Sequence, residues 1–431
     1  MPFKQSFYIK SMGCKSNQFE GDLVSENLQK AGYKRTFDLT NAGFYILNSC
    51  SVTHKSDSET LYLLRNIKHK YPSITTVLTG CVAQIEKENL LKYDYIDYVF
   101  GNNDKFNIAE LLSQGSTHVS DIMTISTFNY QTLKDTSKTR FSLKIQDGCN
   151  NRCAYCIIPF ARGKSRSASS DFIVEQINNA VEKGFKEVVF TGIHIGQWGI
   201  DFDKTLLDLL VDIEENTNIP RFRLGSLNPL EITEEMLDFL QSSNKFCPHF
   251  HLSLQSACNK TLKSMNRFYK VEDYLLQIED ICNRFKNAFL GCDIITGFVG
   301  ETDEDFDITV ENLKKSKLSK IHTCPYSIRK GTQAEKMEGH LPSEIKQKRA
   351  EIIKEISKQK YEEFIKSNMG TIQEVLIEKH PDKKTNLLKG RTANYLEVLI
   401  TDIEPSEHYL NTIQKIKIEK ADASSIFAKI L

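Results

Sequence analysis

Three closely spaced cysteines carry the clearest chemical signal in this sequence. The stretch QDGCNNRCAYC places Cys149, Cys153 and Cys156 within eight positions. Three thiolates at such spacing can hold three corners of a 4Fe-4S cluster and leave the fourth iron open to a ligand that is not protein. Zinc is the alternative, but a structural zinc site normally needs a fourth ligand nearby, and no second Cys or His pair follows Cys156. The spacing favours iron and sulfur over zinc.

Three further cysteines are widely spaced but share one kind of position. Cys14, Cys50 and Cys81 each follow a short β-like run: FYIKSMG, FYILNS and TVLTG. Helix-like segments separate these runs, which predicts βα units and a parallel sheet. The carboxyl ends of parallel strands open onto one crevice, so the three cysteines are expected to converge there.

The rest of the chain predicts two further domains. Residues 115–140 are rich in Ser, Thr and Asn and are interpreted as a linker, with a boundary near residue 135. Six strand-like runs then alternate with helical stretches: FSLKIQ, EVVFTG, RFRLGS, HFHLSLQ, FLGCDIITGF and KIHTCPYS. This repeat predicts a βα barrel or partial barrel with its chemistry at the carboxyl ends of the strands. A charged helix over 343–366 and a small antiparallel β-barrel built from IQEVLIE, NYLEVLI and TIQKIKIE should complete an α/β protein.

Composition limits the classes of function. The 431 residues contain 56 basic and 56 acidic side chains, so any binding of nucleic acid must use a local patch. No apolar run is long enough to span a membrane and no signal peptide is visible, which predicts a cytoplasmic protein. In that reducing compartment, eleven cysteines are expected to bind metal, react or pack rather than form disulfides.

The cysteine motif has a known counterpart. CxxxCxxC with Tyr155 before the last cysteine resembles the motif of radical S-adenosylmethionine (AdoMet) enzymes. GCKSNQ, NSCSVT and LTGCVAQ resemble the cysteine segments of the methylthiotransferase N-terminal domain, and GIHIG, RLGSLNP, HLSLQS, MNRFY and DIITGFVGETDEDF resemble that family's barrel motifs. The tail resembles a TRAM domain, a β-barrel associated with RNA binding. The resemblance implies a methylthiotransferase N-terminal domain over 1–115, a radical SAM core over 135–366 and a TRAM domain over 368–431.

The resemblance also implies two iron-sulfur clusters. Cys149, Cys153 and Cys156 would hold a 4Fe-4S cluster whose open iron binds AdoMet, from which one electron releases a 5′-deoxyadenosyl radical. Cys14, Cys50 and Cys81 would hold a second 4Fe-4S cluster that carries the sulfur to be methylated. By match to the family, the AdoMet side of the barrel would be lined by Tyr155 through its backbone, Gly192, Ile193, His194, Ser226, Gln255, Arg267 and Asp293.

The implied reaction is methylthiolation of carbon 2 of a modified adenosine at tRNA position 37. IQDGCN, GIHIG, RLGSLNP and PYSIRKGTQA look most like the branch that acts on N6-threonylcarbamoyladenosine. The alternatives are N6-isopentenyladenosine of tRNA, an aspartate of a ribosomal protein, or, from another class, a zinc-stabilised RNA-binding protein without catalysis. The expected partners are AdoMet, the tRNA anticodon stem-loop, and an unidentified electron donor and sulfur source.

Several residues have two open interpretations. Arg162, Lys164 and Arg166, just behind the cysteine motif, could contact RNA phosphates, or could be solvated or paired with a carboxylate. In the tail, Tyr395 could stack on a base or fill the small barrel, beside the local basic group Lys383, Lys384, Lys389 and Arg391. Core packing is expected for the five remaining cysteines, Cys247, Cys258, Cys282, Cys292 and Cys324.

Overall fold

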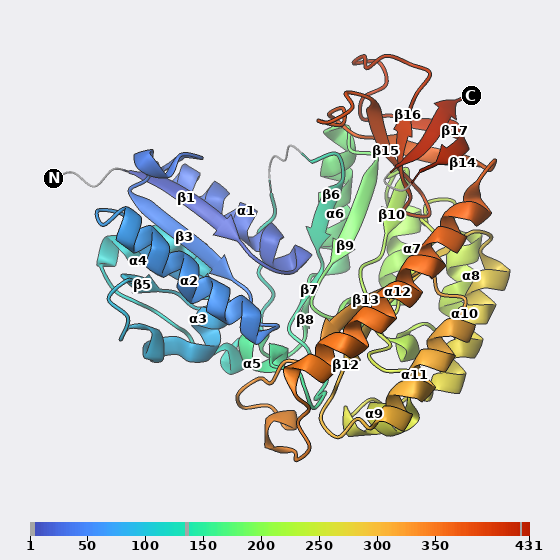
Figure 1. Ribbon diagram of the computed structural model, residues 1–431. Helices are drawn as coiled ribbons and strands as arrows, with labels where there is room; N and C mark the ends of the chain where they lie inside the picture. Colours follow the sequence, from blue (N-terminus) through green and yellow to red (C-terminus); the bar gives the residue numbers. More distant parts are fainter. Residues whose placement is uncertain (1–4, 134–137, 423–424) are drawn as a thin grey trace.

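A computed structural model describes residues 5–133, 138–422 and 425–431 of the chain (Figure 1). It contains a parallel sheet with helices, a larger open βα barrel, and a small β-barrel at the C-terminal end. The expected α/β fold class is confirmed. The boundary near residue 135 lies outside the described residues, and the intervals 1–115, 135–366 and 368–431 remain predictions.

The N-terminal part is a five-stranded parallel sheet in the order β2-β1-β3-β4-β5. The strands are β1 (Ser6–Ser11), β2 (Lys34–Arg35), β3 (Phe44–Ser49), β4 (Thr75–Gly80) and β5 (Tyr98–Val99). Its helices are α1 (Lys15–Lys30), α2 (His54–Lys70), α3 (Cys81–Glu86) and α4 (Ile108–Gln114). All six residues of β3 are buried, as expected for a central parallel strand covered on both faces. The strands predicted from FYIKSMG, FYILNS and TVLTG are present as β1, β3 and β4.

The central part has the six predicted strands, all parallel. They are β6 (Phe141–Lys144), β9 (Glu187–Thr191), β10 (Arg221–Arg223), β11 (His249–His251), β12 (Phe289–Thr296) and β13 (Lys320–Pro325). They form two sheets, β10-β9-β6 and β11-β12-β13, which the bridges Phe222↔Phe246 and Leu227↔Leu252 connect. Within the described ranges, β6 and β13 do not pair, so the barrel is open along one side.

Helices cover the outside of this open barrel. They are α6 (Ser170–Glu182), α7 (Leu206–Asn216), α8 (Glu234–Ser242), α9 (Asn259–Ser264), α10 (Val271–Arg284) and α11 (Asp303–Lys315). One face of α10 packs on the core, because Val271, Tyr274, Ile278 and Ile281, at helical spacing, are all buried. A short pair of antiparallel strands, β7 (Gln146–Asp147) and β8 (Arg166–Ser167), and helix α5 (Ile158–Arg162) frame the three-cysteine loop.

The C-terminal part follows the long helix α12 (Ser343–Asn368). Its five strands close into a barrel in the order β14-β15-β16-β18-β17. Their bounds are β14 (Ile372–Ile377), β15 (Leu388–Thr392), β16 (Glu397–Ile400), β17 (Ile413–Ala421) and β18 (Ile426–Ile430). The sequence predicted β14, β16 and β17 but missed β15 and β18.

Buried arginines fix the small barrel onto the central one. Arg221 and Arg223 on β10 both pair with Glu187 on β9. Arg221 donates to the carbonyl of Arg391 at 2.8 Å, and Arg223 donates to the carbonyls of Ala393 at 2.8 Å and Thr392 at 3.2 Å. The small barrel is therefore held against β10, at one end of the central barrel (Figure 1).

None of the described helices combines the length and the apolar character that crossing a membrane would require.

Candidate active site

The loop with Cys149, Cys153 and Cys156 lies between β7 and α5, next to the carboxyl end of β6. The backbone N–H of Cys149 donates to Gly163 at 3.1 Å, and that of Cys156 donates to Cys153 at 3.0 Å. Burial, and then the nearby thiols of Cys153 and Cys149, raise the pKa of Cys156 to about 12. The local chain path therefore gathers the three thiols in one place.

Gly148 allows the chain to enter this loop. Its φ is +72°, and a Cβ there would lie 1.9 Å from the carbonyl oxygen of Lys164. Only glycine adopts this positive φ without strain and, having no Cβ, also escapes the contact with the backbone oxygen. The residue before the first cysteine is therefore fixed by geometry.

Two cationic or ionisable side chains face the sulfur atoms. His194 Nδ1 lies 3.2 Å from Cys149 Sγ, and Arg267 Nη1 lies 3.5 Å from Cys153 Sγ. The other ring nitrogen of His194 contacts Glu231 and Asn228. Burial acts to lower the pKa of His194, but its hydrogen bonds with Cys149 and Glu231 raise it to about 9. Positive charge next to the sulfurs favours their thiolate form, which is the form that binds iron.

The segment after β9 is held against the cysteine loop by one side chain. Gln146 Oε1 accepts hydrogen bonds from the backbone N–H of Ile193 at 3.1 Å and of His194 at 2.7 Å. A Cβ on Gly192 would lie 2.7 Å from Ile195 Cγ2 and 3.0 Å from this same Gln146 oxygen. These three predicted AdoMet residues thus form a tight backbone turn directly beside Cys149.

The other predicted AdoMet residues are distributed around the barrel. Ser226 is exposed after β10, and Asp293 on β12 contacts His251 through a 2.8 Å hydrogen bond. Gln255 has φ of +70° and its N–H donates to the carbonyl of Asp293 at 2.7 Å. The half-buried Tyr155 ring packs edge-on against Phe298, with ring centroids 6.3 Å apart.

The N-terminal cysteines lie at the carboxyl ends of three neighbouring strands. Cys14 follows β1 and precedes α1, Cys50 follows β3, and Cys81 is the first residue of α3 after β4. A Cβ on Gly13 would lie 2.5 Å from Cys50 Sγ, so the first and second segments touch. Burial, with Cys81 and Cys14 nearby, raises the pKa of the Cys50 thiol to about 11. The structure thus brings together thiols that are far apart in sequence.

The chemistry of these two thiol sets fits iron-sulfur clusters. The described ranges contain no group of three or more His, Cys, Asp or Glu side chains placed to hold a single metal ion. A 4Fe-4S cluster has a different requirement, because each thiolate binds its own iron atom. Each set offers three neighbouring thiols and leaves one corner of such a cluster for a ligand outside the protein.

A buried ionic network, which sequence reasoning missed, joins the two cysteine regions. Glu20 on α1 contacts Lys105, Lys144 and Arg162, and all four side chains are buried. Arg162, at the end of α5, also lies 3.5 Å from Asp147. No local motif in the sequence signals this network, since its members come from different parts of the chain.

The network corrects one interpretation of the basic residues. Arg162 is buried by its contacts with Glu20 and Asp147, and Arg166 is buried with its guanidinium 2.8 Å from Asp147. An RNA phosphate contact is therefore wrong for these two arginines, and the alternative of pairing with a carboxylate holds. Lys164 is exposed between them.

A cleft of about 720 Å³ connects all three parts of the molecule. Its lining comes from the N-terminal part, the interior of the open barrel, α12 and the small barrel: Gly13, Cys14, Lys15, Gln18, Leu224, Gly225, Ser226, His249, His251, Phe289, Asp293, Lys320, His322, Tyr361, Arg391, Tyr395 and Glu397. Cys14 thus opens into the same space as Ser226 and Asp293. The HFH pattern of β11 was the available signal for His249 and His251, because residues two apart on a strand share one face.

Tyr395 lies at the junction of these parts. Its ring centroid is 4.2 Å from that of His249 and 5.9 Å from that of Phe289, both from the central part. The ring is half-buried and lines the cleft, so it joins the small barrel to the central one instead of only filling the small barrel.

Four of the five remaining cysteines fit the expected packing role. Cys247, Cys258 and Cys292 are buried and Cys282 is half-buried, packed against the main core. Cys324 is exposed on β13, so its predicted core position is wrong. The alternation of β13 turns it to the same side as the exposed His322.

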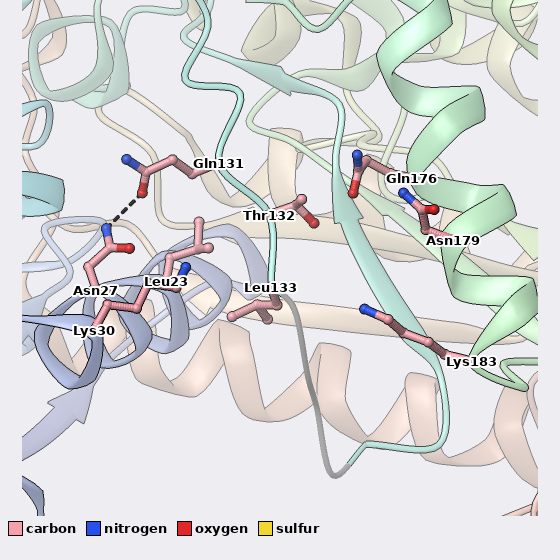
Figure 2. Close-up of a pocket in the computed structure, with 9 residues that line it drawn as sticks. All are labelled: Leu23, Asn27, Lys30, Gln131, Thr132, Leu133, Gln176, Asn179 and Lys183. Carbon is pink, nitrogen blue, oxygen red and sulfur yellow. Dashed lines mark hydrogen bonds between the residues drawn. The ribbon is translucent and has the colours of Figure 1, made fainter.

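Figure 2 shows a second cavity, of about 620 Å³. Side chains of α1, the linker and α6 line it, and Asn27 donates to Gln131 at 2.7 Å across it. Its lining contains no cysteine, so the cleft at Cys14 is the candidate active site.

Comparison with known proteins identifies the family. A family described as the Radical SAM superfamily matches residues 143–313, and one described as uncharacterized protein family UPF0004 matches residues 6–101. A threonylcarbamoyladenosine tRNA methylthiotransferase, MtaB, of Aquifex aeolicus is 34% identical over 398 residues, which cover 90% of this chain and 97% of that protein. The chain belongs to the radical SAM methylthiotransferases.

Other relatives agree with this assignment, and one solved structure shares the fold. MtaB of Bacillus subtilis is 32% identical over 95% of this chain and 93% of its own length. A tRNA-2-methylthio-N(6)-dimethylallyladenosine synthase of Clostridium tetani is 31% identical over 90% of this chain and 89% of its own length. The radical AdoMet methyltransferase TsrM of Kitasatospora setae shares the fold, with a TM-score of 0.55 and 13% identity over 74% of this chain and 75% of that chain.

Family membership decides between the broad alternatives. Radical SAM methylthiotransferases are enzymes that use AdoMet and 4Fe-4S clusters, so the predicted enzyme class and cofactors are confirmed. The noncatalytic zinc alternative is wrong. The roles of individual cysteines and barrel residues remain predictions.

Proposed function

We propose that this protein transfers a methylthio group to carbon 2 of N6-threonylcarbamoyladenosine at tRNA position 37, with AdoMet as methyl donor and radical source. One observation carries the proposal: Cys14 of the N-terminal set lines the same cleft as Ser226 and Asp293 of the barrel. Sulfur held at Cys14 and AdoMet held at Ser226 and Asp293 would therefore share one space with the adenine base. The relatives named for this substrate are 32% to 34% identical to the chain.

The protein's own residues have definable tasks in this scheme. When bound at Cys149, Cys153 and Cys156, a 4Fe-4S cluster would supply the electron that cleaves AdoMet. The backbone turn over Gly192 to His194 keeps the cofactor side of the cysteine loop rigid through Gln146. The buried network at Glu20 holds α1, which begins beside Cys14, against the cysteine loop. These groups orient the reactants and keep the site dry, which is the part of catalysis that a protein supplies to cofactor chemistry.

Two alternatives keep the chemistry and change the substrate. N6-isopentenyladenosine is the nearer one, since dimethylallyladenosine synthases are 31% identical to the chain. An aspartate of a ribosomal protein is the other. The electron donor and the sulfur source are further partners that the proposed reaction requires.

Nucleoside mass spectrometry of tRNA from a strain without this gene tests the substrate. We expect 2-methylthio-N6-threonylcarbamoyladenosine to disappear, its unmethylthiolated precursor to accumulate, and complementation to reverse both changes. Loss of 2-methylthio-isopentenyladenosine instead would move the substrate to the alternative nucleoside. No change in either nucleoside would reject tRNA as the substrate.

Two matched triple variants test the assignment of the cysteines. Changing Cys149, Cys153 and Cys156 to Ala should lower the iron content of anaerobically prepared protein by about half and abolish AdoMet cleavage. Changing Cys14, Cys50 and Cys81 to Ala should remove about the same amount of iron. This variant should still cleave AdoMet but should no longer methylthiolate the substrate. Complete loss of iron in either folded variant would contradict two independent clusters.

A further inference from the structure

The cleft contains two lysines whose charge is not used inside the protein. Both acidic residues of its lining are paired: Asp293 with His251 at 2.8 Å, and Glu397 with Arg391 at 2.6 Å. Lys15 and Lys320 line the same cleft, and within the described residues neither has a carboxylate or hydrogen-bond partner. Among the described residues, the cleft therefore presents two ammonium groups that have no carboxylate partner, while each of its two carboxylates contacts a histidine or arginine side chain.

Aromatic rings hold both ammonium groups at the wall of the cleft. Lys320 Nζ lies 4.7 Å from the ring centroid of Tyr361, and Lys15 Nζ lies 5.9 Å from that of Tyr395. Such contacts orient an ammonium without neutralising its charge. Lys320 is half-buried on β13, and Lys15 is exposed immediately after Cys14. An anion entering the cleft would meet both groups, Lys15 next to Cys14 in the chain and Lys320 on the barrel wall.

The two candidate nucleosides differ in the feature that these lysines would recognise. The threonylcarbamoyl group ends in a carboxylate, which is ionised at neutral pH. The isopentenyl group is uncharged and apolar, and would leave the lysines without a partner. We propose that Lys320 and Lys15 bind the carboxylate of the threonylcarbamoyl group and thereby select this substrate. This inference rests on the proposed function.

The position of the lysines favours the modified base over the RNA backbone as their partner. RNA is read by sequence-specific proteins through bases that leave the stack and enter a pocket, while phosphates stay at its rim. Lys320 extends from an interior face of the open barrel, beside Asp293 and His322 in the cleft lining. A base placed with carbon 2 towards Cys14 would bring its N6 group into this same cleft.

A chemical change in the RNA isolates the proposed contact. Three anticodon stem-loops are compared: one with threonylcarbamoyladenosine, one with the methyl ester of its carboxylate, and one with unmodified adenosine. Their affinities for anaerobic holoenzyme with AdoMet are measured by fluorescence anisotropy. A charge-assisted hydrogen bond predicts that wild-type protein binds the free acid about 10- to 100-fold more tightly than the ester.

Variants then assign this preference to the lysines. Lys320→Gln and Lys15→Gln should each reduce the acid-over-ester preference, and the double variant should abolish it, while affinity for unmodified RNA changes less than about twofold. Lys263→Gln, an exposed charge on α9, is the matched control and should keep the full preference. The affinity for AdoMet, measured separately, should be unchanged in all variants.

The outcomes separate this inference from the proposed function. If the double variant weakens all three RNAs equally, the lysines bind phosphate and the inference is wrong, although the substrate assignment stands. If AdoMet affinity falls instead, the lysines serve the cofactor and the inference is wrong. If wild-type protein methylthiolates isopentenyladenosine RNA and leaves threonylcarbamoyladenosine RNA unchanged, the proposed function and the inference both fail.

Discussion

Glu20 is the residue whose loss should destabilise the protein most clearly through charge alone. Its carboxylate is buried among Lys105, Lys144 and Arg162. Burial would raise the pKa of Glu20, but the three cations hold it well below its usual range. The substitution Glu20→Gln keeps the shape of the side chain and removes the charge that compensates these cations.

The size of the effect follows from which cations keep a partner. Lys144 remains 2.9 Å from Asp147, and Arg162 remains 3.5 Å from it. Among the described residues, Lys105 keeps the 3.0 Å hydrogen bond to Asn102 and its contact with the Phe106 ring, but becomes a buried charge without a carboxylate. Breaking a buried pair from one side costs about 3 to 5 kcal/mol. The midpoint of thermal unfolding should fall by roughly 5 to 10 °C, at about 2 °C per kcal/mol for a large chain.

The same variant should show a characteristic pH dependence. Burial lowers the pKa of Lys105, and Glu20 opposes this effect. Without Glu20 the folded-state pKa falls further below the unfolded value of about 10.4. Between these two values the unfolded chain binds more protons, so stability rises with pH. The deficit of Glu20→Gln relative to wild type should therefore shrink as pH is raised from about 7 to 9.

Anaerobic thermal melts followed by circular dichroism measure this deficit. Asp22→Asn on the same helix is the control, because Asp22 forms a partly exposed pair with Lys138 and should contribute less than about 1 kcal/mol. Adding Lys105→Met to Glu20→Gln should restore much of the loss, since it removes the uncompensated charge. A Glu20→Gln variant no less stable than the Asp22→Asn variant would refute the reasoning.

Further predictions concern the glycines beside the cysteines and the attachment of the small barrel. Gly148→Ala, whose Cβ would lie 1.9 Å from a backbone oxygen, should lose about half the iron together with AdoMet cleavage. Gly13→Ala, whose Cβ would lie 2.5 Å from Cys50 Sγ, should lose about half the iron but retain AdoMet cleavage. Gly32 has φ of +92°, and a Cβ there would have no atom within 4 Å, so Gly32→Ala controls for backbone strain and should keep both clusters. Equal iron loss in all three variants would contradict the steric argument. Arg223→Met removes two hydrogen bonds to the small barrel and should speed limited proteolysis after α12, and an unchanged digestion pattern would show that other contacts hold it.

Local patterns predicted most of the secondary structure and the cysteine segments. Alternating hydrophobicity is a property of short segments, which is why the strands that precede Cys14, Cys50 and Cys81, the six central strands and three strands of the tail could be recognised. The strands β15 and β18 were missed. LKGRT has a glycine and two charges in five residues, and IFAKI is one short run at the end of the chain, so pairing with neighbouring strands defines both.

The types and spacing of six cysteines, and the strands that precede them, can be read from local sequence, and they indicate iron-sulfur chemistry. Only the tertiary structure decided which charges are free. Arg162 and Arg166 look like an exposed basic cluster in sequence but are buried against carboxylates, whereas Lys15 and Lys320 attract no notice in sequence and line the cleft without a carboxylate partner among the described residues. The physical reason is that a short segment fixes its own backbone geometry, but the hydration and pairing of a charge depend on whatever distant part of the chain packs over it.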